Sequence, residues 1–275
     1  MTAPAQIHRI DDPADLRVAD YLDVRERDLV GRRRKFVAEG EVVLRSLLGG
    51  RSRFAPCSVL VAEHRLEAQA DLLALVPTDV PVYAAAQAVL DRIAGFHLHR
   101  GLLAIGSRGA EPGLAEFLDA LPVRATVVVA VGIANHDNVG GIFRNAAAFG
   151  AAAVLLDGGS CDPLYRKAIR VSAGACLTVP FVRDGGAVDI LDALAAAGFE
   201  ALALSPAGAE PLRAVSPPAR TALVVGAEGP GLPSEILARC RTVAIPMAAG
   251  TDSLNVATAA AIALYGLAEG RPRQP

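Results

Sequence analysis

The sequence predicts an α/β fold, because short apolar segments alternate with helical segments along most of its 275 residues. In the second half, the stretch TVVVAVGI at residues 126–133 is continuously apolar, as is typical of a strand that helices cover on both faces. Comparable apolar segments follow at residues 153–156, 177–182, 200–204, 222–225 and 243–245. Helical segments lie between most of them, so we expect a mostly parallel sheet with helices on both faces.

The composition fits a folded chain with a large core. Hydrophobic residues make up 52% of the sequence, and the formal net charge is −2. This charge excludes a uniformly basic protein but allows a local basic surface that binds nucleic acid. The four cysteines are far apart without a Cys-x-x-Cys pair, which favours reduced intracellular thiols over disulfides or a zinc site. Because no apolar stretch reaches about 18 residues and no signal-peptide pattern is present, we expect a cytoplasmic protein.

The first half predicts a smaller α/β domain after a weakly ordered lead over residues 1–20. Apolar residues at helical or strand spacing indicate a helix over 42–48, a strand at 58–62, a helix near 66–75, a strand at 80–83, a helix near 86–93 and a strand at 101–105. The stretch 111–124 contains glycine and proline and is the expected linker. It divides the chain into residues 1–110 and residues 125–275.

Two polar groups in the first half are candidate RNA contacts. A basic run at residues 32–35 comprises Arg32, Arg33, Arg34 and Lys35. Alone, such a run is more often a solvated surface. His97 and His99 precede the strand at 101–105, and without a third ligand nearby they do not predict a metal site. RNA contacts and hydrogen bonds to the loop backbone are the alternatives for both histidines.

The first polar segment of the second half, residues 135–150, follows the strand at 126–133 and opens a helix. It reads NHDNVGGIFRNAAAFG. Asn135, Asp137 or Asn138 could cap this helix. Gly140 and Gly141 are poor helix formers, which indicates that another backbone or a ligand approaches closely. Arg144 lies opposite the apolar stripe that contains Ile142, either as an ordinary surface arginine or as a functional group.

The second polar segment, LVVGAEGPGLP at residues 223–233, follows another apolar strand. Gly226 and Gly231 allow the backbone to adapt to a ligand that binds through main-chain groups. The segment does not fit the GxGxxG pattern, and the chain has no Walker phosphate loop, which disfavours a nicotinamide or NTP enzyme. Glu228 is a candidate polar anchor, with a solvated turn carboxylate or a helix cap as alternatives.

The third polar segment, IPMAAGTDSLNVATAAAIALYGL, runs from Ile245 to Leu267. It ends a strand, passes through a polar loop and enters an Ala-rich helix whose first turn carries Ser253 and Asn255. Buried polar side chains are unfavourable without partners. Their position therefore indicates a ligand or a tightly hydrogen-bonded loop.

Together, the three segments resemble the three motifs of the SpoU (TrmH-like) RNA 2′-O-ribose methyltransferases of the SPOUT superfamily. The resemblance covers residues 126–267, and residues 162–175 are similar to the family's intermotif segment. Residues 36–105 resemble the family's ribosomal-protein-like substrate-binding domain, with lower motif specificity. The resemblance implies a C-terminal SPOUT α/β domain with a trefoil knot, which is an exception to the rule that chains do not thread loops. It also implies a homodimer.

The implied activity is S-adenosylmethionine-dependent methylation of a ribose 2′-hydroxyl in structured RNA, with ribosomal RNA favoured over transfer RNA and no metal ion. The positions implied in catalysis or in binding RNA phosphate are Asn138, Arg144, Glu228, Ser253 and Asn255. The positions implied at the cofactor are Leu204, Ser205, Gly226, Gly231, Ile245, Met247 and Leu254. Because arginine is a poor base at its usual pKa, we expect Arg144 to position the phosphate and hydroxyl while another group or water accepts the proton.

Two other functions compete with this interpretation. A non-catalytic RNA-binding relative would keep the fold without turnover, although the retention of all five polar motif positions argues against a decayed site. A generic nucleotide-binding α/β enzyme would need the phosphate loop that this chain lacks. His136-Asp137 replaces the family's frequent Pro-Gly, and Ala173 replaces a frequent Met, which bears on loop shape and substrate preference.

Overall fold

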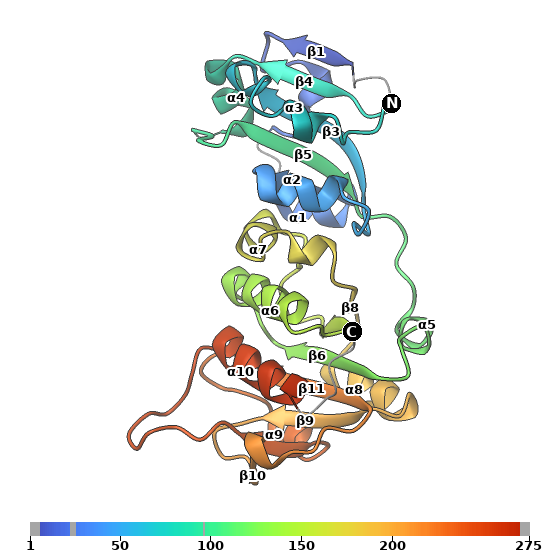
Figure 1. The fold of residues 1–275 in the computed structure, drawn as a ribbon, viewed down its shortest axis with the longest axis vertical. Coiled ribbons are helices and arrows are strands. Elements are labelled where there is room, and N and C mark those ends of the chain that lie inside the picture. Colours follow the sequence, from blue (N-terminus) through green and yellow to red (C-terminus); the bar gives the residue numbers. More distant parts are fainter. Residues whose placement is uncertain (1–5, 23–25, 96, 270–275) are drawn as a thin grey trace. The chain divides into compact units, whose positions relative to one another are not determined.

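The computed structural model describes residues 6–22, 26–95 and 97–269 and shows two compact units (Figure 1). The first unit comprises Met1–Ala110 and Leu164–Thr178, and the second comprises Glu111–Pro163 and Val179–Pro275. Residues 164–178 therefore pack with the N-terminal unit although they lie inside the SpoU-like region. Within the described ranges, no helix is long and apolar enough to cross a membrane.

The first unit is built on a five-stranded sheet with the order β1-β4-β3-β5-β2. Its strands are β1 (Ile7–Ile10), β4 (Val82–Ala85), β3 (Ala55–Ala62), β5 (Leu102–Ser107) and β2 (Lys35–Glu39). The strands β1, β4 and β3 are parallel, whereas β5 runs antiparallel to both β3 and β2. Neither β1 nor β2 was predicted from the sequence.

Helices cover both faces of this sheet, as its buried strands require. They are the 3-10 turns η1 (Leu16–Val18), η2 (Glu63–Arg65) and η3 (Ala175–Leu177), and the helices α1 (Glu26–Gly31), α2 (Glu41–Leu48), α3 (Ala70–Leu73), α4 (Gln87–Ala94) and α7 (Arg166–Val171). One core cluster joins η1 and α4 to the sheet through Val18, Leu90, Ile93, Leu60 and Ile105. The helix expected near residues 66–75 is shorter in the structure and spans only α3.

A weakly ordered lead was expected over residues 1–20; residues 1–5 lie outside the described residues, and residues 6–20 differ from the expectation. There, β1 pairs with β4, and Ile10 and Val18 are completely buried. An edge strand of four residues is too short to show a clear alternation of apolar and polar side chains, so its sequence gives no strong signal.

The second unit confirms the parallel sheet that the sequence predicts. Its seven strands have the order β10-β12-β9-β11-β6-β7-β8, and all neighbouring pairs are parallel. They are β6 (Ala125–Val131), β7 (Ala153–Leu156), β8 (Phe181–Arg183), β9 (Glu200–Leu204), β10 (Glu210–Pro211), β11 (Arg220–Gly226) and β12 (Arg241–Ala244). The strand expected at 177–182 begins only at Phe181, because Pro180 has no N–H to donate to the ladder.

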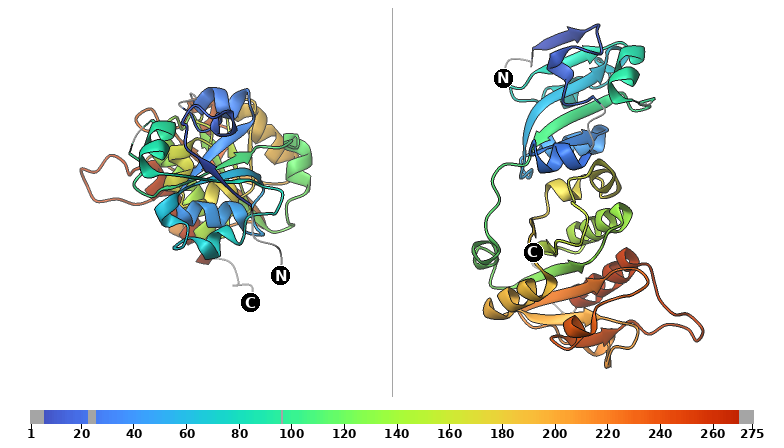
Figure 2. Two further views of the ribbon diagram at one scale, coloured as in Figure 1. Left: turned by 90° about the horizontal axis from the view of Figure 1, so that it is seen from above. Right: turned by 180° about the vertical axis from the view of Figure 1, so that it is seen from behind.

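Helices lie on both faces of the second sheet (Figures 1 and 2). They are α5 (Leu114–Asp119), α6 (His136–Ala148), α8 (Ala187–Ala196), η4 (Leu212–Ala214), α9 (Ser234–Leu237) and α10 (Val256–Glu269). One core cluster packs α5, α8 and α9 against the odd-numbered residues of β6. The helices α6 and α10 pack against each other and on the other face. Residues 111–124, expected to be a linker, contain α5.

The three polar segments all follow carboxyl ends of strands in this sheet, as the sequence predicts. The helix α6 follows β6, the loop at 227–233 follows β11, and the loop at 245–255 follows β12. Because β12, β9, β11 and β6 are consecutive neighbours, these ends lie along one edge of the sheet. In open parallel sheets, ligands bind at this edge.

Candidate functional site

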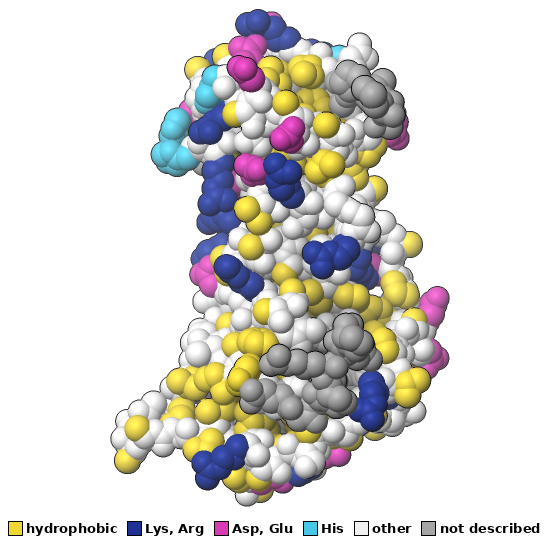
Figure 3. Space-filling model, in the orientation of Figure 1, with side chains coloured by type: hydrophobic (Ala, Val, Ile, Leu, Met, Phe, Trp, Pro, Cys, Tyr) yellow, Lys and Arg dark blue, Asp and Glu magenta, His cyan; other side chains and the backbone are white. Residues whose placement is uncertain are grey.

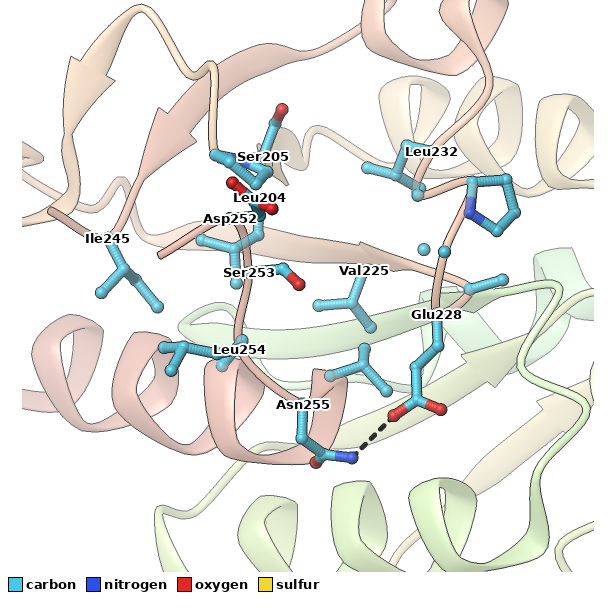
Figure 4. Close-up of a pocket in the computed structure, with 18 of the residues that line it drawn as sticks. Leu204, Ser205, Val225, Glu228, Leu232, Ile245, Asp252, Ser253, Leu254 and Asn255 are labelled. Atoms are coloured by element: carbon cyan, nitrogen blue, oxygen red, sulfur yellow. Dashed lines mark hydrogen bonds between the residues drawn. The ribbon is translucent and has the colours of Figure 1, made fainter. Parts of the chain in front are cut away.

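A cavity of about 660 Å³ lies at the carboxyl ends of β9, β11 and β12 (Figure 4). Its volume lies within the range of about 300–1,000 Å³ that is usual for small-molecule sites. All seven residues that the resemblance implies at the cofactor line it, namely Leu204, Ser205, Gly226, Gly231, Ile245, Met247 and Leu254. Glu228, Ser253 and Asn255 line it as well. The structure thus brings together residues from three separate stretches of the sequence.

Glycine is required at position 226, where β11 ends and the loop turns back on the strand. A Cβ atom on Gly226 would lie only 2.5 Å from the carbonyl carbon of Gly231 and the amide nitrogen of Leu232. The loop is closed by a hydrogen bond of 3.0 Å from the Gly231 amide to the Ala227 carbonyl. Gly229 and Gly231 have φ angles of +87° and +68°, which favour glycine. The glycines that marked this segment therefore shape the cavity wall through close backbone approach.

Asn255 links three parts of the site. Its Oδ1 accepts hydrogen bonds from the amides of Ala257 (3.0 Å) and Thr258 (3.1 Å), which begins α10 with a side-chain cap. Its Nδ2 donates to Oδ1 of Asn138 and to Oε1 of Glu228, both at 2.8 Å. The cap fixes which end of the amide faces the site, because only the oxygen can accept from the helix amides.

Asn138 is the buried member of this cluster. It lies in the first turn of α6 and is 5% exposed. Because its Oδ1 accepts from Asn255, its Nδ2 remains as a donor. Asn138 of α6, Glu228 of the β11 loop and Asn255 before α10 therefore form one connected network.

The helices α6 and α10 approach closely beside this network. Nδ2 of Asn145 donates to the carbonyl oxygen of Ala257 at 2.8 Å. A Cβ on Gly141 would lie 2.7 Å from Cβ of Ala257. The structure thus supplies the reason for a glycine inside α6, which is the close approach of a second helix.

Arg144 points away from the core, as the sequence predicts, and is exposed on α6. It is not among the residues that line the cavity. Ile142, on the opposite side of α6, is 1% exposed. Within the described part of the chain, we find no hydrogen bond or ion pair to the guanidinium group of Arg144. The group is available to a molecule from outside.

The other candidate RNA contacts lie in the first unit. Arg32, Arg33 and Arg34 form the exposed turn between α1 and β2, and Lys35 begins β2. Arg33 and Lys35 both pair with Asp20, at 3.1 and 2.6 Å, and Arg34 donates to the carbonyl oxygen of Gly109. Exposed pairs of this kind contribute only about 0–1 kcal/mol. They leave these cations exchangeable with phosphate.

His97 and His99 lie side by side in the turn before β5. Their ring centroids are 4.5 Å apart, and Nδ1 of His97 lies 2.7 Å from a carboxylate oxygen of Asp91. Over the ranges that the structure describes, no group of three or more His, Cys, Asp or Glu side chains is placed to hold a metal ion.

Asp252, which was not predicted from the sequence, also lines the cavity (Figure 4). With Glu228, it gives the wall two carboxylates, and none of the described lining residues is Lys or Arg. The wall therefore favours a cationic ligand over a phosphate-bearing one. The only available signal was the position of Asp252 immediately before Ser253.

A second feature missed from the sequence holds the start of the α6 segment. Oδ1 of Asp157 accepts from the Gly132 amide (2.9 Å) and from the amide and hydroxyl of Ser160 (2.9 and 2.7 Å). The Ser160 hydroxyl also accepts from the Ile133 amide at 3.0 Å. Next to them, burial raises the pKa of Cys161 to about 12, so this thiol stays neutral and is a poor nucleophile. These bonds fix the backbone that leads into α6.

A profile of the SpoU rRNA Methylase family matches residues 125–265. An uncharacterized tRNA/rRNA methyltransferase of Mycobacterium tuberculosis is 43% identical over 264 residues, which cover 92% of this chain and 89% of the relative.

Solved structures resemble the whole chain. A crystal structure of an RNA 2′-O ribose methyltransferase has a TM-score of 0.76 and 26% identity, covering 96% of this chain and 99% of that one. An AdoMet-bound rRNA methyltransferase from Sinorhizobium meliloti has a TM-score of 0.77 and 24% identity, covering 96% of this chain and 98% of that one. At 24% identity, the similarity to the Sinorhizobium meliloti structure indicates a shared fold only.

Proposed function

The chain belongs to the SpoU rRNA methylase family of RNA methyltransferases, and from this premise we propose that it methylates a ribose 2′-hydroxyl of structured RNA with S-adenosylmethionine. The observation that carries the proposal is the cavity at the strand ends, which joins all seven expected cofactor positions to the Asn138–Asn255–Glu228 network. The 26% identical structure, described as an RNA 2′-O ribose methyltransferase, supports the choice of the ribose hydroxyl.

The cavity suits S-adenosylmethionine in size, shape and charge. Apolar side chains such as Leu204, Ile245 and Leu254 offer flat contacts to an adenine ring, and the glycine loop exposes main-chain groups for hydrogen bonds. The carboxylates of Glu228 and Asp252 suit a ligand that carries a sulfonium and an ammonium group. A nucleoside triphosphate or a dinucleotide would meet two carboxylates and no cation among the described lining residues, which disfavours the generic nucleotide-binding enzyme.

When bound, S-adenosylmethionine supplies an electrophilic methyl group. The task of the protein is then to align the ribose oxygen and to let its proton leave, because a 2′-hydroxyl is a weak nucleophile. In the proposal, Arg144 binds the adjacent RNA phosphate and orients the hydroxyl. Asn138 and Ser253 donate or accept hydrogen bonds at the reacting ribose, and Asn255 holds Asn138 and Glu228 in place. Water or a carboxylate accepts the proton.

The proposal extends to the first unit as a substrate-binding domain. Arg32, Arg33, Arg34, Lys35, His97 and His99 are its proposed RNA contacts. Structured RNA is distinguished from DNA through the 2′-hydroxyl, and phosphate contacts supply affinity that falls with salt. Ribosomal RNA remains the favoured class of substrate, with transfer RNA as the alternative.

A homodimer, a trefoil knot and a cytoplasmic location stay proposals. The knot rests on the resemblance of the three motifs to the family, and beyond β9 the main chain approaches β12 closely, since a Cβ on Gly208 would lie 2.3 Å from the carbonyl carbon of Val243. The homodimer is supported by Ile262 and Tyr265 of α10, which are 39% and 51% exposed.

Two measurements test the proposed function. Calorimetry should show that the purified protein binds S-adenosylmethionine more tightly than ATP or NAD. Incubation with labelled cofactor and unmodified RNA should then place the label on a ribose, mapped by resistance of that position to alkaline cleavage. A protein that binds cofactor and RNA without transferring label would instead be the non-catalytic RNA-binding relative. Label found on a base would exclude the ribose assignment.

A further inference from the structure

We propose that α7 and the turn before β5 form a phosphate-binding surface of the first unit that holds the backbone of the RNA substrate. The surface consists of Arg100, Arg166 and Arg170, which lie at Glu39 and the next residue, Gly40. It is distinct from the basic run at residues 32–35, and it rests on the proposed function because it takes the substrate to be RNA.

Glu39 is the centre of this surface. The carboxylate lies at the end of β2, and its side chain is only 9% exposed. Nε of Arg166 lies 2.9 Å from Oε2 of Glu39, and Nη1 of Arg170 lies 3.7 Å from the same oxygen. The two arginines are one turn apart on α7, so both reach the carboxylate from one side. The buried charge of Glu39 is thereby compensated, as buried charges require.

Arg100 reaches the same place from the turn before β5. A Cβ on Gly40 would lie 2.9 Å from both Cδ and Nη1 of Arg100. Gly40 has a φ angle of +88°, and it directly follows Glu39. The absence of a side chain at position 40 therefore lets the Arg100 side chain lie against the backbone of Gly40, the residue next to Glu39.

Two guanidinium groups thus share a single carboxylate, and a third arginine side chain lies against the next residue, Gly40. The Arg170 side chain is 48% exposed, and Arg100 is exposed as well. In the basic run, Arg33 and Lys35 likewise share one carboxylate, that of Asp20, and Arg34 donates to a carbonyl group. Figure 3 shows Lys and Arg side chains gathered beneath the histidines along one edge of the first unit. The excess of positive charge around Glu39 suits a polyanion.

The chemistry of the groups specifies the ligand further. Arginine offers a planar fork of N–H donors that matches two phosphate oxygens. Glu39 occupies one edge of the Arg166 fork and restrains Arg170, so these side chains lose less rotamer freedom when phosphate binds. A surface that reads only phosphates binds RNA without base specificity and positions it. If the ion pairs of Arg166 and Arg170 with Glu39 only held α7 against β2, the arginines would not contribute to RNA binding.

The test uses the full chain with Arg100 and Arg170 both changed to Gln. Arg166 is left intact because its loss would leave Glu39 buried without a close partner. Binding to an unmodified ribosomal RNA transcript is followed by fluorescence anisotropy over a series of KCl concentrations. Arg9→Gln is the matched control, since Arg9 lies 67% exposed on β1, at the opposite edge of the same sheet. Thermal unfolding and calorimetry with S-adenosylmethionine verify folding.

We expect R100Q/R170Q to bind the transcript roughly ten-fold more weakly at physiological salt, and to lower the slope of log affinity against log salt by about 1.5. The cofactor affinity of this variant and the RNA affinity of R9Q should equal those of the wild type. An unchanged salt slope in a variant that folds, beside a wild type that methylates RNA, would overturn the surface and leave the proposed function standing. A wild type that binds no RNA would overturn both.

Discussion

Asn255 shows how one side chain can organise a site at the scale of single residues. Its amide oxygen caps α10 and its amide nitrogen joins Asn138 to Glu228, so both ends are fully engaged. The cap and the bridge are separable, because aspartate caps helices as well as asparagine does but cannot donate. The residue therefore offers a way to change the site while keeping the helix.

The first prediction uses this difference. Asn255→Asp should keep the cap of α10. It would, however, replace the Nδ2 donor, which now lies 2.8 Å from Oε1 of Glu228, by a carboxylate oxygen that cannot donate to Glu228. We expect methyl transfer to fall at least about ten-fold and stability to fall by about 1–3 kcal/mol, as for a lost hydrogen bond with unpaired partners. The free energy of unfolding comes from urea denaturation, and transfer from a labelled-cofactor assay.

Adding Glu228→Gln to Asn255→Asp should restore part of both losses. The new amide of Gln at position 228 can donate to the new carboxylate at position 255, so donor and acceptor are exchanged between the two positions. The Asn138 side-chain amide can turn over and donate to the same carboxylate. Asn255→Ala is the comparison, because it lacks both cap and bridge and gains nothing from the added glutamine. If the double variant is no better than Asn255→Asp, the bridge has no role in organising the site.

The second prediction concerns Arg144. Its exposed guanidinium lies outside the cavity wall, so Arg144→Ala should abolish methyl transfer while calorimetry shows unchanged affinity for S-adenosylmethionine. Arg144→Lys should recover little, because a single ammonium does not reproduce the bidentate fork. Wild-type turnover in Arg144→Ala would remove this residue from the mechanism.

At the scale of elements, the close packing of α6 on α10 holds the first and third polar segments together. A Cβ on Gly141 would lie 2.7 Å from the Ala257 Cβ, whereas one on Gly266 of α10 would lie 3.5 Å from Leu212 Cδ2, an ordinary contact. The two glycines therefore have the same helix propensity and different surroundings. This contrast makes them a matched pair.

The third prediction compares the two substitutions to alanine. Each gains about 1 kcal/mol in helix propensity, but Gly141→Ala also forces α6 away from α10, at a cost of about 1–3 kcal/mol or more. We expect Gly266→Ala to raise the melting temperature and Gly141→Ala to lower it, together with methyl transfer. Adding Ala257→Gly should relieve the clash. Equal melting temperatures for both single variants would contradict the packing argument.

The elements also show where sequence reasoning succeeds. The strands expected at 153–156 and 200–204 have the same bounds as β7 and β9, because short apolar runs that stop at a polar residue, here Asp157 and Ser205, are strong signals for buried parallel strands. By contrast, β2 (Lys35–Glu39) was missed, because it begins with a charge and ends on a buried Glu39. That carboxylate is stable only through arginines from α7, which lies in a distant part of the sequence, and no local pattern shows such a pairing.

In the candidate site too, residues within local sequence patterns were predicted, and contacts between distant segments were not. Residues inside long motifs, such as Gly226 and Asn255, were found because several motifs occur in a fixed order. Asp252 and the Asp157–Ser160 hydrogen bonds were missed, because single polar residues in loops have no periodicity. The partners of Asp157 and Ser160 include the backbone amides of Gly132 and Ile133, which only the folded chain brings near.

At the scale of the whole molecule, the two units do not correspond to two continuous stretches of sequence. Residues 164–178 belong to the region that matches the SpoU family but pack with the first unit, where the Arg53 amide donates to the Leu177 carbonyl at 3.1 Å. Gly174 lies so close to Ser46 that a side chain would not fit, because a Cβ on Gly174 would lie 2.5 Å from the Ser46 hydroxyl oxygen. A truncation at residue 110 would therefore expose this segment and should not yield an intact second unit.

The last prediction tests the proposed homodimer. Ile262 and Tyr265 lie one turn apart on α10 and are 39% and 51% exposed. The ring centroids of Tyr265 and the half-buried Phe149 are 6.0 Å apart. If a second copy covers this face, Tyr265→Arg would bury an unpaired charge there. We expect its dimer dissociation constant to rise roughly 100-fold, or about 3 kcal/mol, as sedimentation velocity would show.

Val123→Arg is the matched control. Val123 is 84% exposed and lies outside α10, so this substitution should leave sedimentation unchanged. A wild-type protein that sediments as a monomer at assay concentration would contradict the homodimer, and an unchanged Tyr265→Arg dimer would place its interface elsewhere.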